Sequence, residues 1–359
     1  MMWPDRRILD LLGVEHPIVL APMASATNAE LAAAVSSAGA LGGFGAAGIK
    51  PERLGEVVHE IRRRTDRPFN VNLFSPQTEA FDAGLRPGPG LMRRLEEYHA
   101  EMGLGGIPEP KEMYGPAGEQ LEVLIERRVP VISFHFGVEP GLLEKARESG
   151  AKVLCSATTV AEARQLEEAG VDAIIAQGSE AGGHRGTFRG DYRQALIGTL
   201  ALVPRIVDAV DLPVIAAGGV MDARGLVACL VLGASAVQMG TAFLACPEAP
   251  VSGAWRETLL RAEGDDTVVT EAMSGRAARG IRNRYIREVE ALEEPLLPYS
   301  AHYSLSGDLR KAAIEQGNTD FMAMWSGQGV GLIQRRPAAG LVAELAAQSR
   351  ELMERFAGR

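Results

Sequence analysis

The sequence predicts an α/β protein built as a (β/α)8 TIM barrel, with a long loop after strand three and an added, mainly helical segment after strand eight. Between residues 16 and 246, short continuous apolar runs alternate with amphipathic stretches that end at glycine. Continuous apolar runs are typical of parallel strands that are buried on both faces. Eight strand-then-helix units in succession favour a closed barrel over the alternative, a doubly wound open sheet.

The strands and helices of this barrel follow from local patterns. The eight apolar runs that predict strands are residues 17–23, 41–45, 69–74, 129–135, 152–156, 173–177, 213–217 and 236–239. Predicted helices cover 28–37, 51–64, a stretch that ends at Gly150, 159–169, 201–210 and 223–232. Asn28 suits a helix N-cap, and Pro51 suits the first position of the next helix.

Two stretches interrupt the alternation. Residues 75–118 are rich in proline and glycine around a short helical patch at 91–101, and residues 247–330 look like an added helical segment. Loops of this length usually cover a site or bind something. We therefore expect a barrel over 1–246, a C-terminal helix within 331–359 that packs back on it, and a candidate substrate lid over 247–330.

The composition excludes several classes of protein. With 46% apolar residues, 23% charged residues and a net charge of -9, the chain can build a large core and is a poor match to nucleic acid. Three cysteines without CxxC spacing predict reduced core thiols. Neither a signal-peptide pattern nor an apolar run of about 18 residues is present, so we expect a cytoplasmic protein without a membrane partner. A homo-oligomer stays open.

Glycines at two strand ends predict a phosphate site. In barrels of this type, a phosphate often binds between the loops that follow strands seven and eight. The two strand ends carry Gly218-Gly219 and Gln238-Met239-Gly240-Thr241. Glycines let backbone N–H groups approach an anion, and a threonine hydroxyl adds a donor. Tight turns alone would explain either run, but the two runs together favour a phosphate.

Other strand ends supply groups suited to a flat heterocycle. Strand one ends in Ala21-Pro22-Met23, strand three in Asn72 and strand six in Gln177. Side-chain amides can satisfy the alternating donors and acceptors of a flavin edge. The GxGxxG fingerprint of a Rossmann dehydrogenase is absent from the N-terminus, which argues against that class.

His184 is the candidate reacting group. It lies in a glycine-flanked loop directly after strand six. A histidine can take a proton from a substrate carbon or, when charged, bind an anion. His135 ends strand four and is the weaker candidate, because a structural role is as plausible there. No HxH, HExxH or acidic cluster indicates a metal.

These segments resemble the nitronate monooxygenases, formerly called 2-nitropropane dioxygenases. The likeness rests on residues 131–137, 178–186 and 216–220, with further similarity at 21–23, 70–74, 238–241 and 325–329. It implies an FMN-dependent barrel that oxidises alkyl nitronates with dioxygen to a carbonyl compound and nitrite, without a nicotinamide cofactor. It also implies that His184 is catalytic and that FMN is contacted by Ala21, Pro22, Met23, Asn72, Gln177, Gly182, Gly219, Gln238, Gly240 and Thr241.

The substrate side of the predicted site is less defined. Candidate substrate contacts are His135, Tyr299 and Tyr303, and His302 in the added segment is a further candidate. In the implied reaction, His184 would remove the α-proton of a neutral nitroalkane or, when protonated, attract the anionic nitronate.

Two other functions stay open. The FMN-dependent enoyl-acyl-carrier-protein reductases share the barrel, the FMN site and a glycine-flanked histidine. Such an NAD(P)H reductase would act on a thioester or a quinone. A non-catalytic flavin- or phosphate-binding barrel is the third possibility. Residues 134–137 and 185–187 look more like the monooxygenases.

Overall fold

The computed structural model describes residues 3–75, 82, 84–113 and 117–358, and it confirms the predicted barrel. Its eight parallel strands are β1 (Ile18–Leu20), β2 (Gly42–Gly45), β3 (Phe69–Phe74), β4 (Val131–His135), β5 (Lys152–Ala157), β6 (Ala173–Gln177), β8 (Val214–Ala217) and β9 (Ala236–Met239). They pair in the order β1-β9-β8-β6-β5-β4-β3-β2. A bridge between Val19 and Leu41 joins the two ends of this order, so the sheet closes and the open-sheet alternative is wrong.

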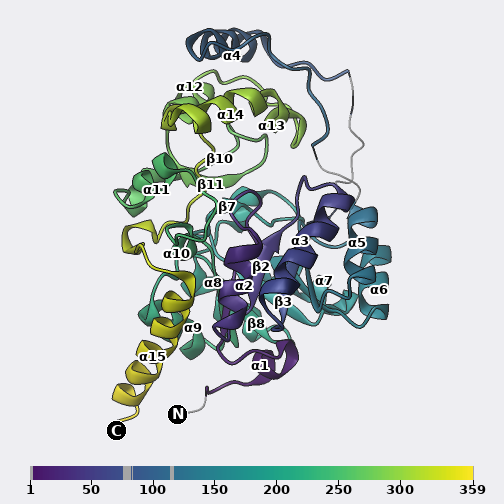
Figure 1. The fold of residues 1–359 in the computed structure, drawn as a ribbon, viewed down its shortest axis with the longest axis vertical. Helices are drawn as coiled ribbons and strands as arrows, with labels where there is room; N and C mark the ends of the chain where they lie inside the picture. Colours follow the sequence, from purple (N-terminus) through teal and green to yellow (C-terminus); the bar gives the residue numbers. More distant parts are fainter. Residues whose placement is uncertain (1–2, 76–81, 83, 114–116, 359) are drawn as a thin grey trace.

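Helices surround the strands (Figure 1). They are α2 (Ala29–Ser37), α3 (Pro51–Arg64), α5 (Ala117–Glu126), α6 (Pro140–Glu148), α7 (Val160–Ala169), α8 (Thr199–Val207) and α9 (Ala223–Val231). The predicted caps are present: the Asn28 side chain accepts a hydrogen bond from the Leu31 N–H, and Pro51 begins α3. Smaller elements are α1 (Arg7–Leu12), η1 (Tyr192–Ala195) and α10 (Thr241–Leu244).

A second body stands over the carboxyl ends of the barrel strands (Figure 1). It contains α11 (Gly253–Leu259), η2 (Gly264–Asp266), β10 (Thr267–Thr270), β11 (Ala278–Ile281), α12 (Arg284–Glu290), α13 (Ala301–Leu305), α14 (Gly307–Gln316) and η3 (Thr319–Phe321). The helices agree with the prediction for 247–330, but the hairpin β10–β11 was not predicted. Its second strand, β11, pairs antiparallel with β7 (Gly183–His184), a short strand that follows β6. The added segment is therefore joined to the barrel by backbone hydrogen bonds to the strand that carries His184.

The stretch after β3 also belongs to this upper body. Its helix α4 (Pro89–Glu101) agrees with the predicted helical patch, and it lies on top of the added segment (Figure 1). Residues 76–81, 83 and 114–116 of the predicted loop lie outside the described residues.

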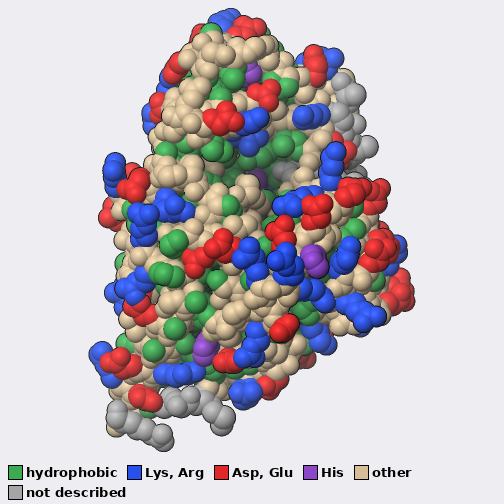
Figure 2. All heavy atoms as spheres, viewed as in Figure 1, with side chains coloured by type: hydrophobic (Ala, Val, Ile, Leu, Met, Phe, Trp, Pro, Cys, Tyr) green, Lys and Arg blue, Asp and Glu red, His purple; other side chains and the backbone are tan. Residues whose placement is uncertain are grey.

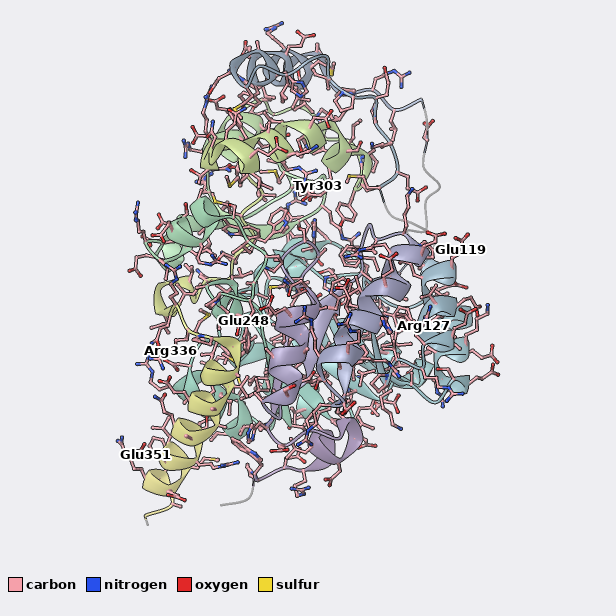
Figure 3. All side chains as sticks on the ribbon, in the orientation of Figure 1. Glu119, Arg127, Glu248, Tyr303, Arg336 and Glu351 are labelled. Carbon is pink, nitrogen blue, oxygen red and sulfur yellow. The ribbon has the colours of Figure 1, made fainter. Side chains whose placement is uncertain are left out.

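The chain then returns to the barrel. After η4 (Val330–Leu332), helix α15 (Ala338–Phe356) packs against α9 and α2. The Glu248 Oε1 accepts a hydrogen bond of 3.0 Å from the N–H of Ala338 at the start of α15. An ion pair joins Arg336 to Glu344 (Figure 3 labels Glu248 and Arg336).

Two further sequence expectations concern thiols and membranes. The three cysteines are unpaired and buried, as predicted. Among the helices that the structure describes, none is long and apolar enough to cross a membrane.

Candidate functional site

A cavity of about 430 Å³ lies at the carboxyl ends of the barrel strands, under the added segment. Figure 2 shows the molecule hollowed between the two bodies, with hydrophobic side chains along the hollow. All the site residues named from the sequence except His302 line this cavity: Ala21, Pro22, Met23, Asn72, His135, Gln177, Gly182, His184, Gly218, Gly219, Gln238, Met239, Gly240, Thr241, Tyr299 and Tyr303. His302 is completely buried outside the cavity lining, and its Nε2 lies 2.8 Å from the Ala272 carbonyl oxygen.

Two of the glycine runs form one edge of the cavity. Gly218 and Gly219 have φ values of 120° and 73°, a backbone region that favours glycine. The backbone N–H groups of Gly219 and Gly240 make no hydrogen bond within the described part of the chain. The hydroxyl of Thr241 accepts a bond of 2.8 Å from the Gly327 N–H. Free N–H donors at a glycine-rich strand end suit an anion.

Two strand-end amides have oxygens that accept no hydrogen bond from a residue that the structure describes. The Asn72 amide nitrogen donates to the backbone oxygen and the hydroxyl of Ser133, at 3.1 and 3.0 Å. Its Oδ1 makes no hydrogen bond to a described residue. The Gln238 Oε1 is buried and likewise lacks a partner in the described chain. A buried carbonyl oxygen without a donor costs free energy, so a bound group with N–H or O–H donors would be favoured here.

In contrast to Asn72 and Gln238, Gln177 uses both ends of its side-chain amide in hydrogen bonds within the protein. Its Nε2 donates to the His184 carbonyl at 3.0 Å, and its Oε1 accepts from the Gly186 N–H at 2.7 Å. Both ends of this amide therefore hold the loop that carries His184.

His184 lies on a short strand at the centre of the site. Its backbone pairs with Ala278 of β11, and its Nε2 is 3.0 Å from the hydroxyl oxygen of Ser274. The ring centroid is 4.7 Å from that of Tyr299 and 5.2 Å from that of Trp325. The hairpin thus holds the imidazole in place, and aromatic rings flank it.

The surroundings keep this imidazole neutral. Burial, together with the nearby His135 and Arg276, lowers the pKa of His184 to about 3. The Arg276 guanidinium stacks on Phe136, 3.8 Å from the ring centroid. A neutral imidazole can accept a proton, but it is not the cation that the alternative role in anion binding requires. The expectation of a protonated His184 is therefore not supported.

His135 supports the His184 loop. Its Nε2 donates to the His184 carbonyl at 3.1 Å, and its Nδ1 is 3.0 Å from the Ser156 hydroxyl. Burial lowers its pKa to about 4. With both ring nitrogens bonded, His135 lines the cavity but has no free nitrogen for a substrate.

The two predicted tyrosines come from the upper body. Tyr299 stacks near Phe74 and Phe136, at centroid distances of 6.5 and 5.9 Å. Tyr303 lies where the added segment faces the barrel (Figure 3). The guanidinium carbon of Arg310 lies 3.4 Å from the Tyr303 ring centroid.

Several cavity residues escaped the sequence reasoning. Phe74, Ser133, Ser156, Arg310 and Trp325 line the cavity, and Ser274 and Arg276 contact its wall. Trp325 lies in residues 325–329, one of the segments that carried the family resemblance, so the resemblance could have identified it as a site residue. Ser274, Arg276 and Arg310 come from a turn and a helix of the added segment, and no sequence motif marks them. Within the described residues, no group of three or more His, Cys, Asp or Glu could hold a metal ion.

Comparison with known proteins agrees with this geometry. The family model for nitronate monooxygenase matches residues 5–348. This chain belongs to the nitronate monooxygenase family. It is therefore related to enzymes of the oxidoreductase class, and the resemblance stated from the sequence is confirmed.

Similar proteins match nearly the whole chain. A nitronate monooxygenase of Pseudomonas aeruginosa is 43% identical over 349 residues, which are 96% of this chain and 99% of that protein. Among solved structures, a nitroalkane oxidase from Streptomyces ansochromogenes has a TM-score of 0.88 and 37% identity, covering 98% of this chain and 99% of its own. FabK from Thermotoga maritima has a TM-score of 0.75 and 32% identity, with 98% of each chain covered. The nitronate monooxygenase fold thus spans both the barrel and the added segment.

Proposed function

We propose that this protein uses FMN to oxidise alkyl nitronates, and nitroalkanes after deprotonation, with dioxygen to a carbonyl compound and nitrite. The observation that supports this most is the placement of a neutral, partly exposed imidazole in the same cavity as the free glycine N–H groups. Family membership and the similarity to a nitroalkane oxidase support the same reaction class.

The cavity residues fit FMN. The N–H groups of Gly219 and Gly240 would hold its phosphate, together with the Thr241 hydroxyl. The side-chain oxygens of Asn72 and Gln238 line the cavity without a hydrogen bond to a described residue, and they would accept hydrogen bonds from its ring or side chain. When bound, FMN supplies the redox chemistry that couples the nitronate to dioxygen.

The chain's own groups handle protons and charge. The neutral His184 would accept the α-proton of a nitroalkane, since a base must be unprotonated to act. The Arg276 guanidinium gives the site a positive charge that favours the resulting anion. The rings of Tyr299 and Trp325 flank the imidazole and would exclude water from it.

The same proposal assigns a separate role to each of the two bodies. Residues 1–246 with the C-terminal helix would form the FMN barrel, and 247–330 would cover the substrate. The contact of α4 with the added segment extends this lid to residues that precede the fourth strand.

Oxygen uptake and nitrite release test the proposal. The purified yellow protein, incubated with FMN, should consume oxygen and release nitrite with a panel of alkyl nitronates, with or without NADPH. In the absence of oxygen, NADH or NADPH should not bleach the flavin rapidly. Rapid bleaching without nitronate turnover would support a reductase instead. A protein that binds no FMN would contradict both functions.

A further inference from the structure

The hairpin of the added segment brings a hydroxyl to the ring of His184. Ser274 lies in the turn between β10 and β11, and β11 pairs with the His184 strand at Ala278. Arg185, the residue after His184, is also bonded to the hairpin, because its N–H donates to the Ala277 carbonyl at 2.8 Å. Ser274 is completely buried. The serine and the imidazole are therefore held in register by backbone bonds.

Counting hydrogens assigns the direction of the bond between them. The Ser274 hydroxyl donates to the Arg276 carbonyl at 3.0 Å. A serine has one hydroxyl hydrogen, and a carbonyl can only accept. The same oxygen lies 3.0 Å from the His184 Nε2, so it must accept there and the Nε2 must donate. In a neutral imidazole, the other nitrogen then carries the lone pair.

The other nitrogen is open to the cavity. The His184 Nδ1 makes no hydrogen bond to a described residue, and it is not among the buried polar atoms that lack a partner. The side chain itself lines the cavity. The lone pair therefore lies where a substrate could reach it.

We infer that Ser274 is a positioning residue that holds His184 in the Nε2–H tautomer, and that Nδ1 is the atom that accepts the substrate proton. The tautomer follows from the hydrogen bonds alone, whereas the proton transfer rests on the proposed function. In that transfer, the α C–H bond breaks, its electron pair stays on the nitronate, and the proton forms a bond to Nδ1. The imidazolium keeps its Nε2–H bond to Ser274.

Nitrogen-15 NMR of the FMN-loaded protein, labelled at the histidine ring nitrogens, tests the tautomer directly. The His184→Asn variant identifies the His184 signals. In the wild type, we expect hydrogen on Nε2 and none on Nδ1 at neutral pH. In Ser274→Ala, the preference should weaken and hydrogen should appear on Nδ1. A wild-type spectrum with hydrogen on Nδ1, or an unchanged Ser274→Ala spectrum, would overturn the inference.

Kinetics provide the second readout. In Ser274→Ala, kcat/KM for a neutral nitroalkane should fall about tenfold or more, because a base in the wrong tautomer cannot accept the proton. Turnover of the pre-formed nitronate should change much less, and Ser274→Thr should restore nitroalkane turnover. An equal loss on both substrates would indicate a merely structural role and contradict the inference. If the NMR result holds but no nitronate is oxidised, the tautomer assignment stands and the proposed function fails.

Discussion

At the scale of single residues, the base role proposed for His184 applies to nitroalkanes and not to nitronates. Burial and the neighbouring His135 and Arg276 lower its pKa to about 3, so the imidazole is neutral at pH 7. A neutral base is needed to deprotonate a nitroalkane, but a nitronate has already lost that proton. The two substrate forms therefore separate the role of the base from every later step.

Replacing His184 by Asn should thus lower kcat/KM for neutral nitroalkanes by about 10² to 10⁴, the usual contribution of a general base. Asparagine can form hydrogen bonds but cannot accept a proton at neutral pH. Nitrite release from pre-formed nitronates should fall far less. Flavin absorbance of the variant serves as the control for cofactor binding. Nitroalkane turnover at the wild-type rate would show that His184 is not the base.

A second residue-scale prediction concerns Gly182, which packs against the backbone of residues 326–327. A Cβ at this position would lie 2.5 Å from both the Gly327 nitrogen and the Ser326 carbonyl carbon. The 326–327 backbone would have to move, and its bond to Thr241 would be disturbed. Overpacking of this kind costs about 1–3 kcal/mol.

We expect Gly182→Ala to weaken FMN binding about tenfold or more, since 1.4 kcal/mol corresponds to a factor of ten. Fluorescence titration of the apoprotein with FMN measures the dissociation constant. Gly118→Ala is the matched control, because a Cβ on this α5 glycine has no neighbour within 4 Å. Equal affinities of the two variants would show that the 326–327 loop does not shape the cofactor site.

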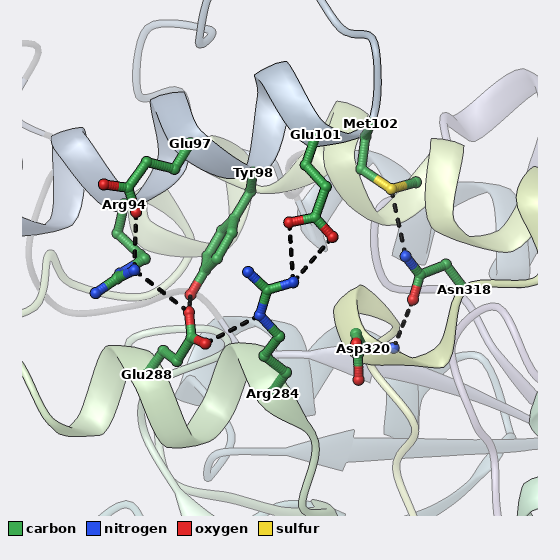
Figure 4. A network of polar contacts seen from close by, with 9 residues as sticks. All are labelled: Arg94, Glu97, Tyr98, Glu101, Met102, Arg284, Glu288, Asn318 and Asp320. Carbon is green, nitrogen blue, oxygen red and sulfur yellow. Dashed lines mark hydrogen bonds and ion pairs between the residues drawn. The ribbon is translucent and has the colours of Figure 1, made fainter.

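At the scale of elements, α4 is held to the added segment by a polar network (Figure 4). Arg284 of α12 bonds both to Glu101 of α4 and to Glu288, each at 2.9 Å. The Tyr98 hydroxyl donates to Glu288 at 2.7 Å, and Arg94 pairs with the same carboxylate at 3.6 Å. One guanidinium thus links two segments that lie far apart in the sequence.

Arg284→Ala should loosen α4 without affecting the barrel. Of the two ion pairs of Arg284, the one with Glu101 joins α12 to α4, and a partly exposed pair of this kind contributes up to about 1 kcal/mol. Hydrogen exchange of the α4 amides should therefore accelerate up to roughly fivefold, while the amides of β4 to β6 keep their rates. Arg53→Ala removes an exposed pair with Glu56 on α3 and should leave α4 unchanged. Unchanged exchange in Arg284→Ala would mean that apolar packing alone holds α4.

The elements also show what the sequence could and could not predict. All eight barrel strands were predictable because each lies in a short run of mainly apolar or small residues within a repeating strand–helix unit. The strands β10 and β11 have four residues each and β7 has two, too few for a clear periodicity. The α4 helix was predictable, but its docking through Arg284 was not, because that contact joins positions 183 residues apart.

The same distinction applies to the site. Residues at strand ends could be predicted to meet, since a barrel brings all its strand ends to one mouth. Ser274 and Arg310 could not, because their position depends on how the added segment folds over that mouth.

At the scale of the whole molecule, buried histidines make the stability of the fold depend on pH. His302, in the added segment, is completely buried, and its Nε2 lies 2.8 Å from the Ala272 carbonyl oxygen. Burial lowers its pKa from 6.5 to about 4. Between these two values, the unfolded chain binds a proton that the folded chain does not. Stability is therefore lost as the pH falls through this range, and the contribution levels off below about 4.

His302→Gln should remove this part of the acid sensitivity. Glutamine can still donate to the Ala272 carbonyl, but it does not titrate. Between pH 7 and 4, the wild type should lose about 3 kcal/mol of unfolding free energy more than the variant, given about 1.4 kcal/mol per pKa unit. Urea unfolding with excess FMN at each pH measures this difference. His59→Gln, on the exposed face of α3, should parallel the wild type. If His302→Gln also parallels it, the loss at acid pH comes from other groups, of which His135 and His184 are the first to examine.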